Sequence, residues 1–146
     1  MSIQHAQAIK SCKEFFSIRE LMPPDLVGKF SEEILWKQID TDLLLALAWV
    51  RAEYNDQIVI NNWSFKAPGT LKYCGFRPSS CSEGAVLSGH RLGKSADLHA
   101  KDLIRLLEIC MRCPYITEVE DERDTPTWVH ISVRAHAGDG VRVVRA

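Results

Sequence analysis

The chain has 146 residues and a mass of 16.5 kDa, the size of one ordinary domain. Its hydrophobic fraction of 46% and charged fraction of 25% are those of a globular protein, which excludes a disordered tail, a collagen-like repeat and a coiled-coil rod. Eighteen basic and nineteen acidic residues give a net charge of -1, so no overall basic field exists that would hold nucleic acid by its phosphates. The longest apolar runs, such as Leu43–Val50, are too short to span a membrane.

The first part of the chain predicts helices. Residues Gln4–Phe16 are expected to form a helix, and Pro23-Pro24 then forces an extended break. Ser31 has the position of an N-cap, followed by an acidic first turn. Apolar residues at helical spacing between Thr41 and Tyr54 predict the central buried helix.

The later part predicts a small sheet. The expected strands are Ile58–Ile60, Ser95–His99, Thr117–Glu120 and Trp128–Arg134, with a helix at Asp102–Met111 and a hairpin loop at Asp121–Thr127. Residues 61–83 are irregular, and loops of this length in a compact domain usually carry function. Helices followed by a mostly antiparallel sheet define the α+β class. Without a repeat or linker, we expect a single domain over residues 1–146, with a helical part at 1–56 and a functional-site part at 57–135.

The cysteines and the N-terminus indicate in which cellular compartment the protein is expected. Residues Met1–His5 lack a basic stretch followed by an apolar one, so we expect no secretory signal and synthesis in the cytoplasm. Five cysteines, an odd number, favour free thiols in a reducing compartment: Cys12, Cys74, Cys81, Cys110 and Cys113. The pair Cys110-x-x-Cys113 suggests a zinc ribbon or a redox motif, but no second pair at ribbon spacing exists, and burial at a helix end explains it better.

The most informative stretch is Ser88-Gly89-His90-Arg91-Leu92-Gly93-Lys94-Ser95-Ala96-Asp97, followed later by Trp128-Val129-His130. Two imidazoles and a carboxylate are a natural ligand set for Zn²⁺, and three protein ligands leave a fourth position for water. With one anionic ligand the complex stays positively charged, so that this water can ionise near neutral pH and attack a carbonyl. Gly93 fits a tight return between His90 and Asp97. We therefore expect one zinc ion, held by His90, Asp97 and His130.

This stretch resembles the zinc peptidases that include D-Ala-D-Ala carboxypeptidases and the L-Ala-D-Glu endopeptidases of phage endolysins. Their pattern is Ser-x-His-x-x-Gly-x-(Ala or Ser)-x-Asp, then an aromatic-x-His on a later strand. The chain keeps the seven-residue step from His90 to Asp97, with Ala96 directly before the Asp. Two further segments look like the phage branch: Ile60-Asn61-Asn62-Trp63 and Gly75-Phe76-Arg77. The resemblance covers residues 43–134 and implies a hedgehog/DD-peptidase-like fold with the zinc cleft on the face of its sheet.

The resemblance also implies roles around the metal. An Arg at the place of Arg77 helps to hold the substrate, and the family uses a Ser at the place of Ser88 beside the metal site. Trp128 is expected to wall the cleft beside the last His. Alternation along a strand favours His99 as a ligand, because it shares a face with Asp97, but the family pattern assigns that role to position 130.

The catalytic acid must stand at a different sequence position from the one that is usual in the family. Several members place an acidic residue three positions before the last His, where this chain has Thr127. Alternation turns His130 to the cleft and Val119 to the core, which sends Glu118 and Glu120 to the cleft side. Register does not separate the two. Because the phage branch keeps its acid just before the loop, the order of expectation is Glu120, then Glu118, then Asp124.

The expected function is a zinc-dependent peptidoglycan peptidase, an endolysin-like L-Ala-D-Glu endopeptidase or a D-Ala-D-Ala carboxypeptidase that uses a zinc-activated water. Its substrate would be a peptidoglycan stem peptide or a D-Ala-D-Ala-type peptide, with neither nucleic acid nor a membrane span involved, and we expect a monomer. An endolysin would act at the cell wall. The alternative is a catalytically silent zinc-binding structural or wall-binding domain of the same fold. A third reading is a cytosolic dipeptidase that acts on D-Ala-D-Ala.

Overall fold

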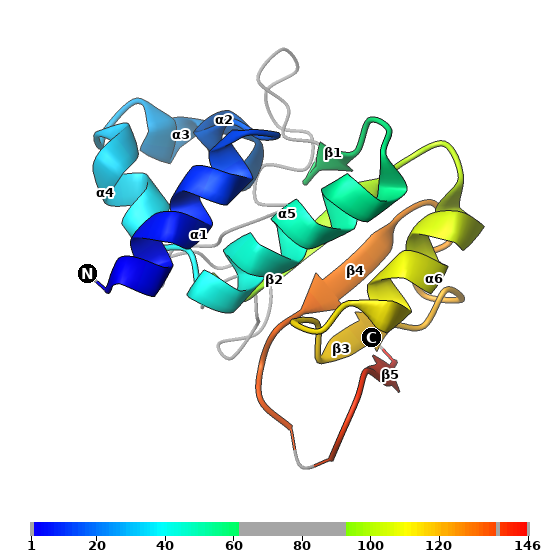
Figure 1. The fold of residues 1–146 in the computed structure, drawn as a ribbon. Helices are drawn as coiled ribbons and strands as arrows, with labels where there is room; N and C mark the ends of the chain where they lie inside the picture. Colours follow the sequence, from blue (N-terminus) through cyan, green and yellow to red (C-terminus); the bar gives the residue numbers. More distant parts are fainter. Residues whose placement is uncertain (1, 62–92, 137, 146) are drawn as a thin grey trace.

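The computed structural model describes residues 2–61, 93–136 and 138–145, which form an α+β domain built on one sheet (Figure 1). The helices are α1 (Ile3–Lys13), α2 (Ile18–Leu21), α3 (Pro24–Val27), α4 (Glu32–Lys37), α5 (Thr41–Tyr54) and α6 (Leu103–Arg112). The strands are β1 (Val59–Ile60), β2 (Ser95–His99), β3 (Glu118–Glu120), β4 (Val129–Ser132) and β5 (Arg142–Val144). Among the described helices, none has the length and apolar character that a membrane crossing needs.

Side-chain caps explain where the main helices begin. The hydroxyl of Ser2 accepts a hydrogen bond from the His5 N–H at the start of α1, and that of Ser31 accepts one from the Ile34 N–H at the start of α4. Asp40 caps α5 in the same way, and α5 ends at Asn55 in the left-handed conformation. The predicted helices are confirmed in these regions. The four-residue helices α2 and α3 were not predicted, because a single turn has no measurable period.

The sheet has the strand order β1-β2-β4-β3-β5. The pairs β1–β2, β2–β4 and β3–β4 are antiparallel, so the predicted hairpin between β3 and β4 is confirmed. Strand β5 was not predicted, and it pairs in parallel with β3 at the edge of the sheet. Its three residues are too few to show alternation, and its partner strand is distant in sequence.

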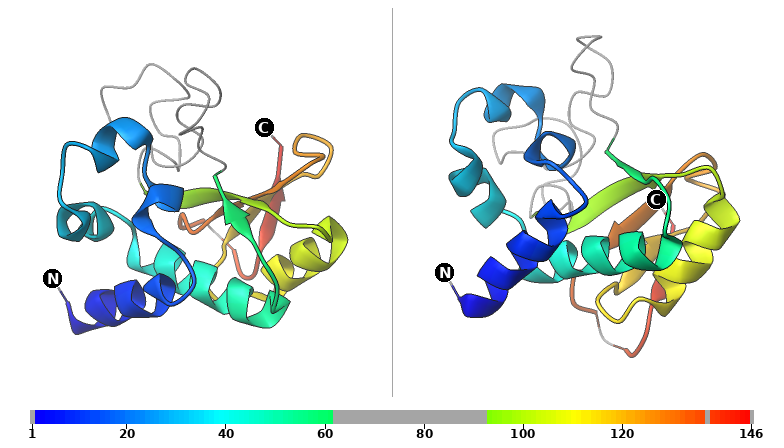
Figure 2. Two further views of the ribbon diagram at one scale, coloured as in Figure 1. Left: turned by 90° about the horizontal axis from the view of Figure 1, so that it is seen from above. Right: turned by 45° about the horizontal axis from the view of Figure 1, so that its top comes forward.

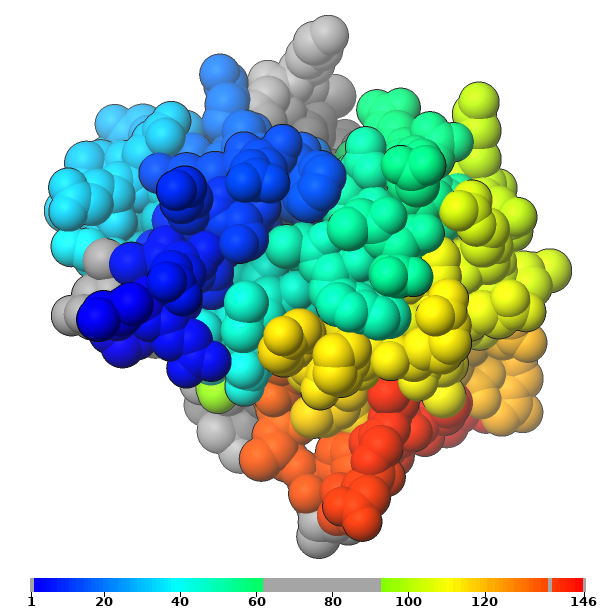
Figure 3. Space-filling model, viewed as in Figure 1, coloured from blue at the N-terminus to red at the C-terminus, as the bar shows by residue number. Residues whose placement is uncertain are grey.

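One face of the sheet is covered by helices. Figure 2 shows α5 and α6 on the same side of the sheet, and Figure 3 shows α1, α5 and α6 side by side on the outer surface of that layer. The apolar side chains of the central strands join the helix residues in one core: Ala96, Leu98, Val119, Val129, Ile131, Leu44, Leu47 and Leu106. Burying one such leucine contributes about 2–3 kcal/mol. Since side chains alternate along a strand, the neighbours of these residues face the opposite side of the sheet.

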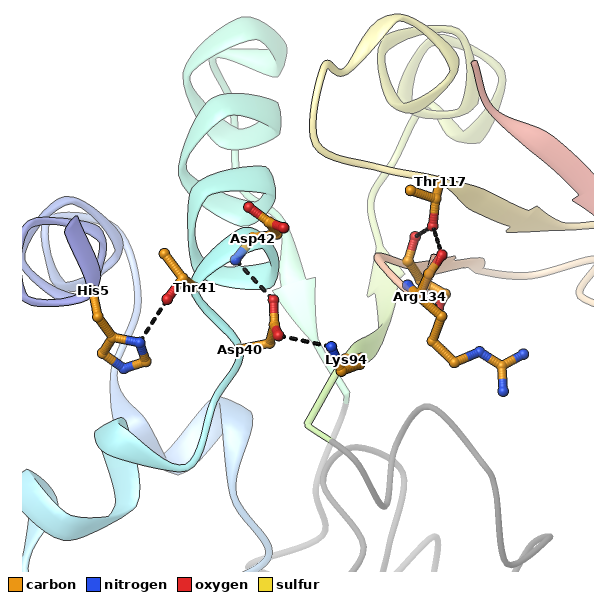
Figure 4. A network of polar contacts seen from close by, with 8 residues as sticks. His5, Asp40, Thr41, Asp42, Lys94, Thr117 and Arg134 are labelled. Atoms are coloured by element: carbon orange, nitrogen blue, oxygen red, sulfur yellow. Dashed lines mark hydrogen bonds and ion pairs between the residues drawn. The ribbon is translucent and has the colours of Figure 1, made fainter. Parts of the chain in front are cut away.

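Polar contacts connect the start of β2 with α5 (Figure 4). The Asp40 carboxylate accepts hydrogen bonds from the N–H of Asp42 and, at 3.0 Å, from the Lys94 ammonium, while the Asp40 N–H donates to the carbonyl of Gly93. Gly93 has φ +68°, a conformation that glycine adopts without strain. The tight return expected between His90 and Asp97 begins outside the described residues. The hydroxyl of Thr117, directly before β3, donates to the backbone carbonyls of Ser132, at the end of β4, and of Arg134. These contacts fix how β2 and β4 enter and leave the sheet.

Candidate metal centre

Three acidic and imidazole side chains meet on the face of the sheet opposite α5 and α6. Asp97 of β2 is the register partner of His130 of β4, and β3 pairs with the other edge of β4 through Val119 and Ile131. The Nδ1 atom of His130 lies 2.7 Å from Oδ1 of Asp97 and 3.7 Å from Oε2 of Glu120. Asp97, His130 and Glu120 therefore form one row across three adjacent strands.

The His130–Asp97 contact assigns the proton of the imidazole. An ionised carboxylate can only accept a hydrogen bond, so Nδ1 of His130 is the donor in the 2.7 Å bond to Asp97. The side chains of Asp97 and His130 are 17% and 19% exposed. Charges that are partly removed from water interact more strongly than exposed ones, so this row is an electrostatically coupled group.

Glu120 differs from an ordinary surface carboxylate. Burial raises the pKa of Glu120 above its usual value, the nearby His130 lowers it, and the carboxylates of Asp97 and Asp124 raise it further, with a net rise. A carboxyl group whose pKa is shifted towards neutral pH can both take up and release a proton there. The surroundings of Glu120 thus suit general acid–base chemistry.

The other two candidate acids are held in ion pairs. Glu118 is buried, and its carboxylate accepts a 2.6 Å hydrogen bond from Arg142 and lies 3.5 Å from Nε of Arg134. Burial would raise the pKa of Glu118, but the hydrogen bond and charge of Arg142, together with Arg134, hold it below its usual value. The carboxylate of Asp124 accepts two hydrogen bonds from Arg145, at 2.7 Å and 3.0 Å. Both groups are bound by arginines, whereas no arginine of the described residues pairs with Glu120.

His99 and Trp128 lie beside this row, each two residues along the chain from Asp97 and His130. Their ring centroids are 6.4 Å apart, and burial lowers the pKa of His99 although the charge of Asp97 opposes the change. Trp128 also lines a hollow of about 140 Å³, which Glu120 borders and to which α6 contributes apolar side chains. The aromatic side chain and the carboxylate thus share the wall of one small cavity.

Three expected site residues, Arg77, Ser88 and His90, lie outside the residues that the structure describes. Within residues 2–61, 93–136 and 138–145, no three His, Cys, Asp or Glu side chains form a group that could hold a metal ion. The described part of the chain contributes two of the three expected ligands, Asp97 and His130.

In the sequence, Asn61 stood out only as part of a segment that looks like the phage branch, and no role was predicted for two features of the site. Asn61 is buried, and its side-chain oxygen accepts a hydrogen bond from the Asp97 N–H. Its position directly after a β-branched run was the available signal, because Asn commonly ends strands in turn conformations. The second feature is the arginine pair around Glu118, which depends on the unpredicted strand β5.

The cysteine pair at the end of α6 consists of buried thiols that are not activated. Cys110 and Cys113 are buried and free, as is Cys12. Burial raises the pKa of Cys110 and that of Cys113, so neither is a thiolate near neutral pH. The expected burial of this pair at a helix end is confirmed.

Comparisons of the chain with protein-family models, with curated proteins and with solved structures find no match.

Proposed function

We propose that the protein is a zinc-dependent peptidoglycan peptidase, an L-Ala-D-Glu endopeptidase or a D-Ala-D-Ala carboxypeptidase with a hedgehog/DD-peptidase-like fold. The observation that carries this proposal is the row of Asp97, His130 and Glu120 across three neighbouring strands. These are two of the ligands and the catalytic acid that the resemblance implies. They come from distant parts of the sequence, and an Asp–His contact of 2.7 Å with a second carboxylate at 3.7 Å supports a shared function.

The residues fit zinc. A carboxylate oxygen and an imidazole nitrogen are both preferred zinc donors, and here they converge from facing positions on β2 and β4. Together with His90, Asp97 and His130 would hold one ion and leave a coordination position open, as catalytic zinc sites do. When bound, zinc supplies Lewis acidity, which polarises the scissile carbonyl and makes water more acidic.

Glu120 performs the proton transfers. Its carboxylate takes a proton from the attacking water and later gives it to the leaving amine, so the group ends each cycle in its starting state. The raised pKa of Glu120 makes its carboxylate a stronger base, which favours the first of these transfers. In the metal-free protein, Asp97 orients the His130 ring by accepting a hydrogen bond from its Nδ1–H.

The substrate contacts would come from Arg77, Ser88 and Trp128. Arg77 would hold a substrate carboxylate by two parallel N–H donors. Ser88 and Trp128 would line the substrate cleft, and Trp128 already borders the hollow next to Glu120. The protein would act as a monomer on a stem peptide.

The decisive experiment is digestion of purified peptidoglycan, with mass spectrometry of the released fragments. We expect cleavage of one type of stem-peptide bond, loss of cleavage with a chelator and its return with added zinc. The same assay on a D-Ala-D-Ala dipeptide separates a wall peptidase from a dipeptidase. A protein that binds zinc but hydrolyses neither substrate is a silent zinc-binding domain, and one that binds no zinc overturns the proposal.

A further inference from the structure

Asn61 has an unusual backbone conformation for a buried residue. It directly follows β1, is 1% exposed and has φ +61°. Among the described residues other than glycine, only Asn55 and Asn61 have a positive φ. Asparagine is one of the few residues with a side chain that tolerates this region. The left-handed conformation ends β1 at a residue that still faces β2.

The side chain of Asn61 completes the pairing that the backbone leaves unfinished. The Asn61 N–H donates to the Asp97 carbonyl at 2.7 Å, as the next pair of an antiparallel ladder would. The return bond, from the Asp97 N–H at 2.9 Å, is accepted by Oδ1 of Asn61 instead of a backbone carbonyl. The Asn61 amide therefore replaces one peptide group of the strand.

The remaining donor of Asn61 is also used. Its Nδ2 donates to the backbone carbonyl of Glu20, at the end of the short helix α2, at 3.1 Å. An amide with both ends bound in a buried position has a fixed orientation, because leaving either group unpaired there is costly. Asn61 thus connects the helical N-terminal part of the chain with the backbone of Asp97.

We infer that Asn61 is a positioning residue, which sets the carboxylate of Asp97 against the imidazole of His130. Asp97 is held on one edge by Asn61 and pairs on the other edge with His130 of β4. Both the N–H and the carbonyl of Asp97 are bound by Asn61, and from this backbone position its carboxylate contacts Nδ1 of His130 at 2.7 Å. For zinc affinity this inference rests on the proposed function, whereas the Asp97–His130 contact itself does not.

The test variant is Asn61→Gly, and the matched control is Asn55→Gly. Glycine keeps the left-handed backbone and removes only the amide side chain. Asn55 is the other left-handed asparagine, exposed at the end of α5 and outside the site, so the control makes the same chemical change elsewhere. Urea unfolding of both variants monitors the fold.

The first measurement needs no metal. In long-range ¹⁵N–¹H spectra of the metal-free protein at about pH 8, the wild type and Asn55→Gly should show His130 protonated at Nδ1 and hydrogen-bonded. Asn61→Gly should lose this signal while keeping a folded spectrum. A His130 signal in Asn61→Gly that equals the wild type overturns the inference.

The second measurement is zinc affinity, by competition with a chelating dye, together with the visible spectrum of the Co²⁺-substituted protein. We expect Asn61→Gly to bind zinc about 10–100-fold more weakly, with an altered Co²⁺ spectrum, and Asn55→Gly to match the wild type. Unchanged affinity and spectrum in Asn61→Gly overturn the inference. If the wild type binds no zinc, the proposed function fails, and the His130 signal alone then decides the role of Asn61.

A conservative variant keeps the test valid if Asn61→Gly does not fold. Asn61→Asp retains the acceptor for the Asp97 N–H and removes the donor to the Glu20 carbonyl. We expect it to keep the His130 Nδ1–H signal of the wild type. Loss of that signal in a folded Asn61→Asp variant overturns the inference, because the acceptor would then not be what positions Asp97.

Discussion

Glu118 of β3 accepts a 2.6 Å hydrogen bond from Arg142 of β5, the strand that runs parallel to β3 at the edge of the sheet. Its side chain is 4% exposed, and Arg134, just beyond β4, lies 3.5 Å from the other carboxylate oxygen. The buried carboxylate therefore joins the end of the chain to the centre of the sheet. It is bound structurally, although it shares a strand face with Glu120.

This arrangement predicts a stability that depends on pH. The pKa of Glu118 in the folded protein is below its usual value, because Arg142 and Arg134 outweigh the effect of burial. Its contribution is thus fully present above the unfolded pKa of about 4.3 and is lost as the pH falls through the lower folded pKa. We expect Glu118→Gln to lower the free energy of unfolding by about 1–3 kcal/mol at neutral pH.

Urea unfolding at several pH values tests this prediction. The difference between the wild type and Glu118→Gln should shrink as the pH falls from about 4 through the lower folded pKa, because the wild-type carboxylate becomes protonated over this range. Glu122→Gln, on the exposed loop between β3 and β4, should unfold like the wild type at each pH. A constant difference between the wild type and Glu118→Gln down to low pH would contradict the ion-pair explanation.

The metal assignment predicts a contrast between histidines. His90→Ala and His130→Ala should lose zinc, measured by elemental analysis, while His99→Ala should keep the wild-type stoichiometry. His99 is the matched control, since it is on the same strand as Asp97 but lies against Trp128. Full zinc occupancy in His90→Ala would refute the ligand set, and loss of zinc only from His99→Ala would show that the wrong imidazole was chosen.

Zinc should also stabilise the fold. Binding to the folded state alone adds about 2.7 kcal/mol at a free zinc concentration a hundred times the dissociation constant. The wild type should therefore melt at a higher temperature with zinc than with a chelator. In His130→Ala the two melting temperatures should coincide, and a zinc-dependent rise in that variant would speak against His130 as a ligand.

The assignment of Glu120 as the catalytic acid predicts that its substitution lowers the rate of hydrolysis without loss of bound zinc. Glu120→Gln should keep zinc and fold but hydrolyse peptidoglycan about two to four orders of magnitude more slowly, because the proton transfers lose their carrier. Glu32→Gln, on the exposed first turn of α4, is the control and should hydrolyse like the wild type. Wild-type rates in Glu120→Gln would transfer the role to Glu118 or Asp124.

Because their thiols are buried, three cysteines should be protected from alkylation in the native protein. Burial and the nearby Glu20 carboxylate raise the pKa of Cys12 to about 12, and burial raises the pKa of Cys110 as well. Alkylation of the native protein at about pH 8, followed by peptide mapping, should leave Cys12, Cys110 and Cys113 unmodified. All three should react in urea. Rapid native modification of Cys110 would support the redox reading of the Cys-x-x-Cys pair.

The sequence predicted those elements whose pattern is local. The bounds of α5 and β2 agree with the expectation, because a capped apolar helix and an alternating strand carry their signals within themselves. Strand β5 escaped prediction, since its three residues pair in parallel with a strand that lies far away in the sequence.

The same distinction applies to the site. Alternation sent Glu118 and Glu120 to one face of the sheet, but it carried no information on which of them an arginine would bind. That depends on Arg142 of β5, the strand not predicted. Asn61 was overlooked for a related reason: its role depends on a left-handed backbone and on the opposing Asp97, neither of which a single sequence displays.

The strand order has a consequence for the dynamics of the site. Strand β4 lies in the middle of the sheet, with β2 and β3 hydrogen-bonded on either side, whereas β1 and β5 are its edges. Edge strands exchange their amide hydrogens through local openings of low free energy. A central strand exchanges only when most of the domain unfolds. The backbone amides of β4 around His130 should therefore be among the slowest to exchange. The Asp97–His130 contact would then persist while the edges fray, and it would be lost only together with the fold.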